Sequence, residues 1–262
     1  FLVIGCEGSM GKRRTKHLKE FGHEVIGWDI THKTKMPIVP DCDGVVISTP
    51  PDHHEEYFCN ISLPTFVEAS VIPYKPQGNI FPSCTMRFHP TVEYLRKHIK
   101  ETKPLAFIYH VGNHIEDWHH NEDYRTKYFA KYVTGGAKEI VAYELCWLVD
   151  VFGPIVMSLI IGEKLSKLQM EANDYYRGLL EFASDMVGTL IVDTVSRPRV
   201  RELKIIYDGN TESYDMGDVD WEDCYRREIK AWIDIFGGSE WPYSVEEDLN
   251  ILYEINMGED DE

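Results

Sequence analysis

The chain has 262 residues, of which 43% are hydrophobic and 27% charged. This composition is typical of a globular protein with one large or two modest domains and excludes a disordered or fibrous chain. Lys and Arg number 27 against 44 Asp and Glu, which gives a formal net charge of −17. Because so acidic a protein repels phosphate backbones and anionic lipid, we expect neither nucleic-acid nor membrane-surface binding.

The six cysteines are scattered and include no C-x-x-C pair. In a chain of this size the pattern favours reduced thiols in a cytoplasmic protein over a disulfide framework or a zinc site, and no signal peptide is visible. The longest apolar stretch, residues 145–162, contains Asp150 and the Gly153-Pro154 pair. A membrane span would not tolerate these residues, so we predict core elements there.

The first thirty residues predict a βαβ unit. An apolar strand over residues 1–4 leads into a turn with Gly5, Gly8 and Gly11, then into a helix that begins near Ser9 and Met10. The glycines permit close approach of a pyrophosphate, and the helix start directs free N–H groups at it. The G-x-x-G-x-x-G spacing is one residue longer than the common G-x-G-x-x-G, and Glu7 is the additional residue.

A second strand, residues 24–28, ends at Asp29. A carboxylate there accepts both ribose hydroxyls of NAD and repels the 2′-phosphate of NADP, so NAD is the expected cofactor and NADP the less favoured one. The alternative is a Rossmann-like fold that has lost its cofactor, since loss of binding would leave the hydrophobic pattern intact.

Two further buried strands, residues 44–48 and 65–67, follow a loop over residues 30–43 that contains Pro37 and Pro40. Ligands collect at the carboxyl ends of strands in open α/β sheets. We therefore expect the residues after these strands to surround the nicotinamide: Thr49, Pro50, His54 and Glu68. For His54 the alternative is a polar residue at a helix N-terminus.

From residue 87 the pattern changes to a helix (90–100), a strand (105–112), a polar loop (113–127) and a helix that follows Gly135-Gly136 and ends at Phe152. Strands without intervening helices then predict an antiparallel sheet. They are expected at residues 155–161, 167–172, 178–183, 186–194 and 202–207, with a hairpin turn at 208–211. Helices follow over 221–236 and after Ser244, and the tail 258–262 is expected to fray. The predicted fold class is α/β, with a Rossmann domain over 1–86 and an α/β domain with a mostly antiparallel open sheet over 87–262.

Several segments together resemble the glucose–fructose oxidoreductase, inositol dehydrogenase and rhizopine-catabolism (Gfo/Idh/MocA) family. They run in order along the chain: V-I-G-C to G-K-R-R (3–14), V-V-I-S-T-P (45–50) with His54, V-E (67–68), M-R-F-H-P (86–90), G-G through F-G (135–153), and P-R to Tyr207 (198–207). The resemblance implies NAD(P)-dependent oxidation or reduction of a secondary alcohol in a sugar, sugar nucleotide or cyclitol. It also implies a C-terminal sheet that often forms an oligomer interface, so we expect a homo-oligomer.

The sequence departs from the family at the proton-handling positions. The family's Glu-Lys-Pro reads Glu68-Ala69-Ser70 here, and its Asp and His on the helix after the glycine pair read Glu139 and Tyr143. Glu139 and Tyr143 lie one helical turn apart, so together they could hold a substrate hydroxyl, and they are the catalytic candidates. The alternatives are a packed tyrosine and a solvated or ion-paired glutamate.

The loop over residues 117–125 resembles that of family members in surface-sugar biosynthesis. Arg125 suits a substrate carboxylate or phosphate and Trp118 suits the apolar face of a sugar. With His119 and Tyr124 they are the predicted substrate-binding residues. The alternative is a packed interdomain crossing. Asp117, His119, His120 and Asp123 suggest a metal, but we assign none.

Two functions remain. The first is an NAD-dependent oxidoreductase for a sugar, sugar nucleotide or cyclitol. The second is a catalytically impaired relative that serves as a ligand-binding or assembly module, as Ala69, Tyr143 and Glu7 would suggest.

Overall fold

The computed structural model describes residues 1–32, 41–58, 61–75, 79–118 and 123–257. The chain divides into two compact units: unit 1 comprises Phe1–Thr85 and Trp221–Leu249, and unit 2 comprises Met86–Asp220 and Asn250–Glu262. The first boundary is next to the predicted one, whereas the segment 221–249 returns to unit 1 and does not stay with the C-terminal domain. The expectations for Pro37, Pro40, His119, His120 and residues 258–262 lie outside the described residues.

Unit 1 contains a five-stranded parallel sheet with the order β2-β1-β3-β4-β5. Its strands are β1 (Leu2–Ile4), β2 (Ile26–Trp28), β3 (Val45–Ile47), β4 (Thr65–Val67) and β5 (Ile80–Pro82). Strands β1, β3 and β4 are buried throughout, as expected where both faces of a parallel sheet are covered. Because β1 lies between β2 and β3, the strand order reverses at β1, and the carboxyl ends of β1 and β3 form a topological switch point.

Over the described residues, three α-helices lie wholly in unit 1: α1 (Ser9–Glu20), the short α2 (His54–Phe58) and α5 (Trp221–Asp234). Helix α5 packs against α1. Its fully buried Trp232 lies 5.1 Å from Phe1 and 6.0 Å from Phe66 between ring centroids. The large aromatic surface of α5 thus completes the core on one face of the sheet, which is why a segment so distant in sequence belongs to unit 1.

A buried ion-pair network also joins α5 to the sheet. Arg14 is fully buried and contacts Glu68 through two hydrogen bonds of 2.7 and 3.0 Å and Glu228 through one of 2.7 Å. Burial opposes the guanidinium charge, but the two carboxylates outweigh it and hold the pKa of Arg14 above its ordinary value. The buried Glu228 also accepts hydrogen bonds from Ser83 Oγ, the Cys84 N–H and Thr85 Oγ1. The buried charges of Arg14 and Glu228 therefore both have partners, as charges in a low-dielectric environment require.

Unit 2 is built on a six-stranded sheet with the order β11-β10-β6-β9-β8-β7, in which only the β6–β9 pairing is parallel. Its strands are β6 (Ala106–Gly112), β7 (Ile155–Glu163), β8 (Tyr175–Phe182), β9 (Val187–Asp193), β10 (Val200–Tyr207) and β11 (Asn210–Asp215). The predicted fold class is confirmed. The predicted strand at 167–172 is wrong: the segment forms bends, because the buried Asp174 carboxylate accepts the backbone N–H groups of Leu165 and Ser166.

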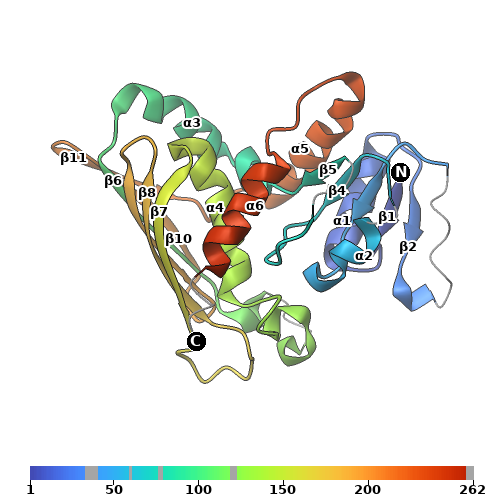
Figure 1. Cartoon of the computed structure of the whole chain (residues 1–262), viewed down its shortest axis with the longest axis horizontal. Helices are drawn as coiled ribbons and strands as arrows, with labels where there is room; N and C mark the ends of the chain where they lie inside the picture. Colours follow the sequence, from blue (N-terminus) through green and yellow to red (C-terminus); the bar gives the residue numbers. More distant parts are fainter. Residues whose placement is uncertain (33–40, 59–60, 76–78, 119–122, 258–262) are drawn as a thin grey trace. The chain divides into compact units, whose positions relative to one another are not determined.

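Helices α3 (Pro90–Thr102) and α4 (Ala137–Phe152) lie on one side of this sheet, with α4 against β8 and β9 (Figure 1). On the other face, apolar side chains are more than 40% exposed: Ile108, Met157, Leu159, Leu179 and Val187. Helix α6 (Val245–Asn256) follows Ser244 as predicted and begins with a capping box, since the Glu247 N–H donates to Ser244 Oγ and the Ser244 N–H to Glu247 Oε2. Over the described residues, no helix is both long and apolar enough to traverse a bilayer.

Candidate functional site

The turn between β1 and α1 requires glycine at two of its three glycine positions. Gly5 has a φ of +81°, and a Cβ there would lie 2.6 Å from the Ser48 carbonyl oxygen. A Cβ on Gly11 would lie 2.1 Å from the Gly5 carbonyl oxygen, so this glycine lets α1 pack directly on the strand end. At Gly8 the nearest atom would be 3.3 Å away and φ is −68°. A Cβ on Gly8 would thus make a tight contact but not the clash found at Gly5 and Gly11, and its missing side chain leaves the turn open to a ligand.

The N-terminus of α1 is free to bind an anion. Gly8 is the N-cap residue, and no side chain caps this end of the helix among the described residues. The first-turn N–H groups of Ser9, Met10 and Gly11, together with the helix dipole, therefore point at whatever lies against the turn. The glycine turn and the uncapped helix together fit a phosphate group, as expected for a dinucleotide.

Thr49 lies after β3 at the same switch point. A Cβ on Gly5 would meet its methyl group at 3.2 Å, so Thr49 packs over the glycine turn. The hydroxyl oxygen of Thr49 is buried and has no hydrogen-bond partner among the described residues. The half-buried Pro50 follows it. A buried hydroxyl of this kind is suited to bind a ligand group beside the turn.

His54 binds the backbone of this segment. It is 1% exposed, and its Nε2 lies 2.8 Å from the Thr49 carbonyl oxygen, to which it donates a hydrogen bond. Burial lowers the pKa of His54 to about 4. His54 is therefore neutral at physiological pH and acts by fixing the backbone of Thr49.

Asp29 follows β2, as predicted, and its carboxylate binds the protein's own backbone. One oxygen accepts the Glu7 N–H at 3.1 Å, and the other accepts the N–H and hydroxyl of Thr31 at 3.0 and 2.9 Å. Burial would raise the pKa of Asp29, but these donors outweigh it and lower the pKa. A carboxylate has about four acceptor positions, so roughly one remains for a ribose hydroxyl.

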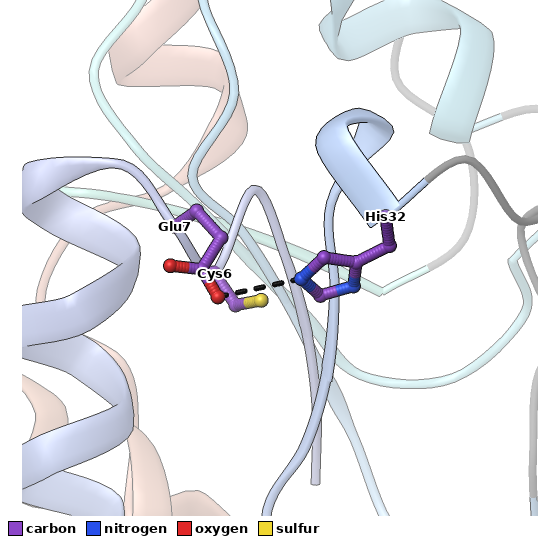
Figure 2. A group of neighbouring side chains, drawn as sticks. All are labelled: Cys6, Glu7 and His32. Atoms are coloured by element: carbon purple, nitrogen blue, oxygen red, sulfur yellow. Dashed lines mark hydrogen bonds and ion pairs between the residues drawn. The ribbon is translucent and has the colours of Figure 1, made fainter.

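The additional residue of the turn, Glu7, has a half-exposed side chain. Its carboxylate lies 3.3 Å from His32 Nε2 and 3.4 Å from Lys12 Nζ. Figure 2 shows Glu7 reaching across the turn toward His32 beside the Cys6 thiol. The negative charge of Glu7 would repel phosphate groups, and the neighbouring basic side chains of His32 and Lys12 offset it.

Glu68, predicted beside the nicotinamide, is engaged in the ion pair with Arg14 and accepts a hydrogen bond from Ser48 Oγ at 3.2 Å. Ala69 follows it and is half-buried. Lys75, the nearest lysine along the chain, is exposed.

In unit 2, Glu139 lies in the first turn of α4. Its Oε1 accepts a hydrogen bond from the Tyr128 hydroxyl at 2.9 Å, and its buried Oε2 has no hydrogen-bond partner among the described residues. Burial raises the pKa of Glu139 to about 7. Tyr143 is half-buried one turn further along α4. Sequence reasoning missed Tyr128, which carries no motif and meets Glu139 only in the fold.

The residues of the predicted substrate loop do not all line one cavity. Tyr124 and Arg125 line a cavity of about 790 Å³, together with His114, Lys167 and Gln169. Arg125 is bound by Asp123 through two bonds of 2.7 Å and contacts Gln169 Oε1 at 3.0 Å. Trp118 instead packs edge-on against Phe129, with ring centroids 6.3 Å apart. His119 lies outside the described residues.

A scan against protein-family models and a search of curated proteins give no match for this sequence. Solved structures do match. A myo-inositol dehydrogenase from Corynebacterium glutamicum superimposes with a TM-score of 0.73 at 12% identity over 98% of this chain and 94% of its own. UDP-N-acetylglucosamine 3-dehydrogenase from Acidithiobacillus ferrooxidans gives 0.68 at 14% identity over 98% and 95%. GenD2 from gentamicin A biosynthesis, solved in complex with NAD, gives 0.75 at 15% identity over 97% and 91%.

At such low identity these matches bear on the fold alone. Each covers almost the whole of both chains, so the likeness extends over both units. The resemblance found in the sequence is confirmed at this level: the chain has the two-domain architecture of Gfo/Idh/MocA-type dehydrogenases.

Proposed function

We propose that this protein is an NAD-dependent oxidoreductase that acts on a secondary alcohol of a sugar, sugar nucleotide or cyclitol. The observation that carries the proposal is the turn after β1, where Gly5 and Gly11 are required by the fold while Gly8 and the uncapped start of α1 are left open to a ligand. This combination at a topological switch point is suited to a diphosphate. When bound, NAD would supply the hydride acceptor.

The groups of unit 1 would bind and orient the cofactor. The N–H groups of Ser9 and Met10 would hold the diphosphate, and the remaining acceptor position of Asp29 would hold a ribose hydroxyl, which favours NAD over NADP. The buried Thr49 hydroxyl, fixed by His54, would contact the nicotinamide side. Glu68 would act indirectly, because Arg14 already occupies its carboxylate.

Glu139 is the best candidate for a proton acceptor. A carboxyl group with a pKa of about 7 is half ionised at neutral pH, which suits a general base. Its Oε2 would take the proton of the substrate hydroxyl, the Tyr128 hydroxyl would hold Oε1, and Tyr143 would help to position the substrate. Arg125, Tyr124, Trp118 and His119 are proposed to contact the rest of the substrate. Sugar-type substrates are supported by the names of the matched structures, which include dehydrogenases of myo-inositol and of UDP-N-acetylglucosamine.

One observation favours the alternative of a catalytically impaired binding or assembly module. The position of the family's lysine is Ala69, directly after a glutamate that is closed on Arg14, so no cation from this segment can polarise a substrate hydroxyl.

We also propose a cytoplasmic homo-oligomer that binds neither nucleic acid nor membranes. No disulfide links the five cysteines in the described part of the chain, which fits a reducing compartment. The exposed apolar side chains on the second sheet form a contiguous surface of the kind that subunit contacts cover.

The test is a titration of the purified protein with NADH, followed by nicotinamide fluorescence. We expect saturable binding that Asp29→Asn shifts toward NADPH, whereas Asp43→Asn, an exposed carboxylate of the same unit, leaves the preference unchanged. No binding at millimolar NADH would reject the proposal.

Turnover on a panel of sugars, sugar nucleotides and cyclitols then separates the two functions. We expect Glu139→Gln to lower kcat by about 10²–10⁴-fold while NADH binding is retained. NADH binding without turnover on any member of the panel would favour the binding module.

A further inference from the structure

The start of the nucleotide turn carries a second set of functional groups. The Cys6 thiol, a Glu7 carboxylate oxygen and a His32 ring nitrogen all lie within 4.8 Å of one another (Figure 2). We propose that these three side chains bind a zinc ion, with a fourth coordination position open to water or another small oxygen ligand. This proposal goes beyond the oxidoreductase function and does not depend on it.

The chemistry of the donor set favours zinc. Thiolate sulfur, imidazole nitrogen and carboxylate oxygen are the three ligand types that zinc takes in proteins, whereas magnesium and calcium take oxygen. The Glu7 and His32 ligand atoms lie 3.3 Å apart. Two ligands at about 2.0–2.1 Å from a tetrahedral ion are separated by roughly that distance. These two side chains therefore need little movement to share an ion, and the Cys6 sulfur lies within 4.8 Å of both.

The backbone that carries the ligands is fixed by two consecutive residues, Trp28 and Asp29. The Asp29 carboxylate accepts the Glu7 N–H at 3.1 Å, and the Asp29 carbonyl oxygen accepts the His32 N–H at 3.0 Å. The adjacent Trp28 carbonyl oxygen accepts the Cys6 N–H at 3.3 Å. All three ligands are thus attached to the end of β2, which lowers the entropic cost of bringing them around an ion.

Space for the thiol is provided by Gly27. A Cβ at this position of β2 would lie 2.8 Å from the Cys6 sulfur. Glycine inside a strand weakens it and often marks a close approach by another group. Here the approaching group is the metal-ligating thiol.

Access and charge also favour a cation. Glu7 and His32 are exposed, so an ion can enter from solvent, and the net charge of −17 attracts cations. The Lys12 ammonium, 3.4 Å from Glu7, is exposed and can be displaced from that carboxylate. His32 lies 25 residues after Glu7 and belongs to no recognisable ligand motif, so the sequence alone gives no sign of this cluster.

The experiment is a titration of the metal-free protein with Co²⁺ in the absence of dinucleotide. We expect a thiolate-to-cobalt charge-transfer band and the intense visible bands of tetrahedral cobalt, saturating at one ion per chain and removed by Zn²⁺. Cys6→Ser should abolish the charge-transfer band, and Glu7→Gln and His32→Asn should each weaken Co²⁺ binding by about 10-fold or more, the scale on which lost contacts near a metal act. Gly27→Ala should weaken binding because it crowds the thiol.

Two matched controls test the specificity. His53 and Glu56 form an exposed histidine–carboxylate pair at 3.1 Å, and Cys42 is another thiol of unit 1. His53→Asn and Cys42→Ser should leave the cobalt spectrum unchanged. No charge-transfer band in the wild-type protein, or a band that survives in Cys6→Ser, overturns the proposal. Because the titration contains no dinucleotide, its result is independent of the NADH experiment.

Discussion

At the scale of single residues, burial and the partners it provides decide which titratable side chains remain able to react with a substrate. His54 and Glu68 follow β3 and β4, and each is bound by the protein itself, His54 by the Thr49 carbonyl and Glu68 by Arg14. Glu139 differs because only one of its oxygens has a partner among the described residues. Its raised pKa has a consequence for stability as well as for catalysis.

We predict that Glu139 makes the protein less stable as the pH rises. Its folded-state pKa of about 7 exceeds the ordinary value of 4.5, so between these values the folded protein keeps a proton that the unfolded chain releases. The free energy of unfolding should therefore fall between pH 4.5 and 7, by at most about 3 kcal/mol. Glu139→Gln should remove this fall, which urea unfolding at pH 5 and pH 8 would measure.

Glu171→Gln is the control for this measurement, since Glu171 is an exposed glutamate of the same unit and should leave the pH dependence unchanged. An identical slope in wild type and Glu139→Gln would show that Glu139 is ionised at no cost in the folded protein.

At the scale of elements, the glycines of the turn before α1 have two different roles. Gly5 and Gly11 avoid clashes within the fold, whereas Gly8 makes room for a ligand. We predict that Gly11→Ala lowers the melting temperature strongly, because its Cβ would lie 2.1 Å from a backbone oxygen of the same turn. Gly8→Ala should lower the melting temperature less, since its Cβ would lie 3.3 Å from the nearest atom, but should weaken NADH binding by crowding the diphosphate. Thermal unfolding and NADH titration of both variants would check this.

Equal melting temperatures for the two variants would contradict the role of Gly11, and unchanged NADH affinity in Gly8→Ala would contradict the role of the open glycine.

Most elements were predictable because their patterns are local. The capping box at Ser244, the turn at 208–211 and the alternation in β8 and β9 each depend on neighbours in sequence. The wrong or missing predictions have two causes: contacts with distant residues, and elements too short to show a pattern. The segment 167–172 has a strand-like composition, but Asp174 binds the backbone that leads into it. Strand β5 is only three residues long and ends in a proline, so it has little pattern of its own.

The candidate site was predictable for the same reason. The glycine turn, Asp29 and Thr49 each come directly after a strand, and the apolar pattern of the sequence shows where those strands end. The pairing of Glu139 with Tyr128, and of Glu7 with His32, arises from contacts that no spacing encodes.

At the scale of the whole molecule, the exposed apolar face of the second sheet is the surface that we propose for self-association. We predict that the wild-type protein is an oligomer at micromolar concentration and that the double variant Leu159→Lys, Leu179→Lys is a folded monomer. Both leucines are more than half exposed and lie opposite each other on β7 and β8, so charges there would oppose contact between two such faces. Sedimentation velocity, with circular dichroism to confirm folding, would check this.

Leu165→Lys is the matched control, because Leu165 is 62% exposed but lies outside the strands. A wild-type protein that sediments as a monomer, or a double variant that stays oligomeric, would contradict the assignment of this face.

The return of α5 to unit 1 has a consequence for synthesis on the ribosome. Glu228 is made 214 residues after Arg14, the buried cation that it must neutralise. Domains that emerge early generally fold as they emerge, but here the nascent sheet keeps an incompletely compensated guanidinium and an uncovered aromatic face until α5 has been translated. Folding of unit 1 is therefore completed only after most of unit 2 has been made, and chaperone contact during elongation should concentrate on the early strands.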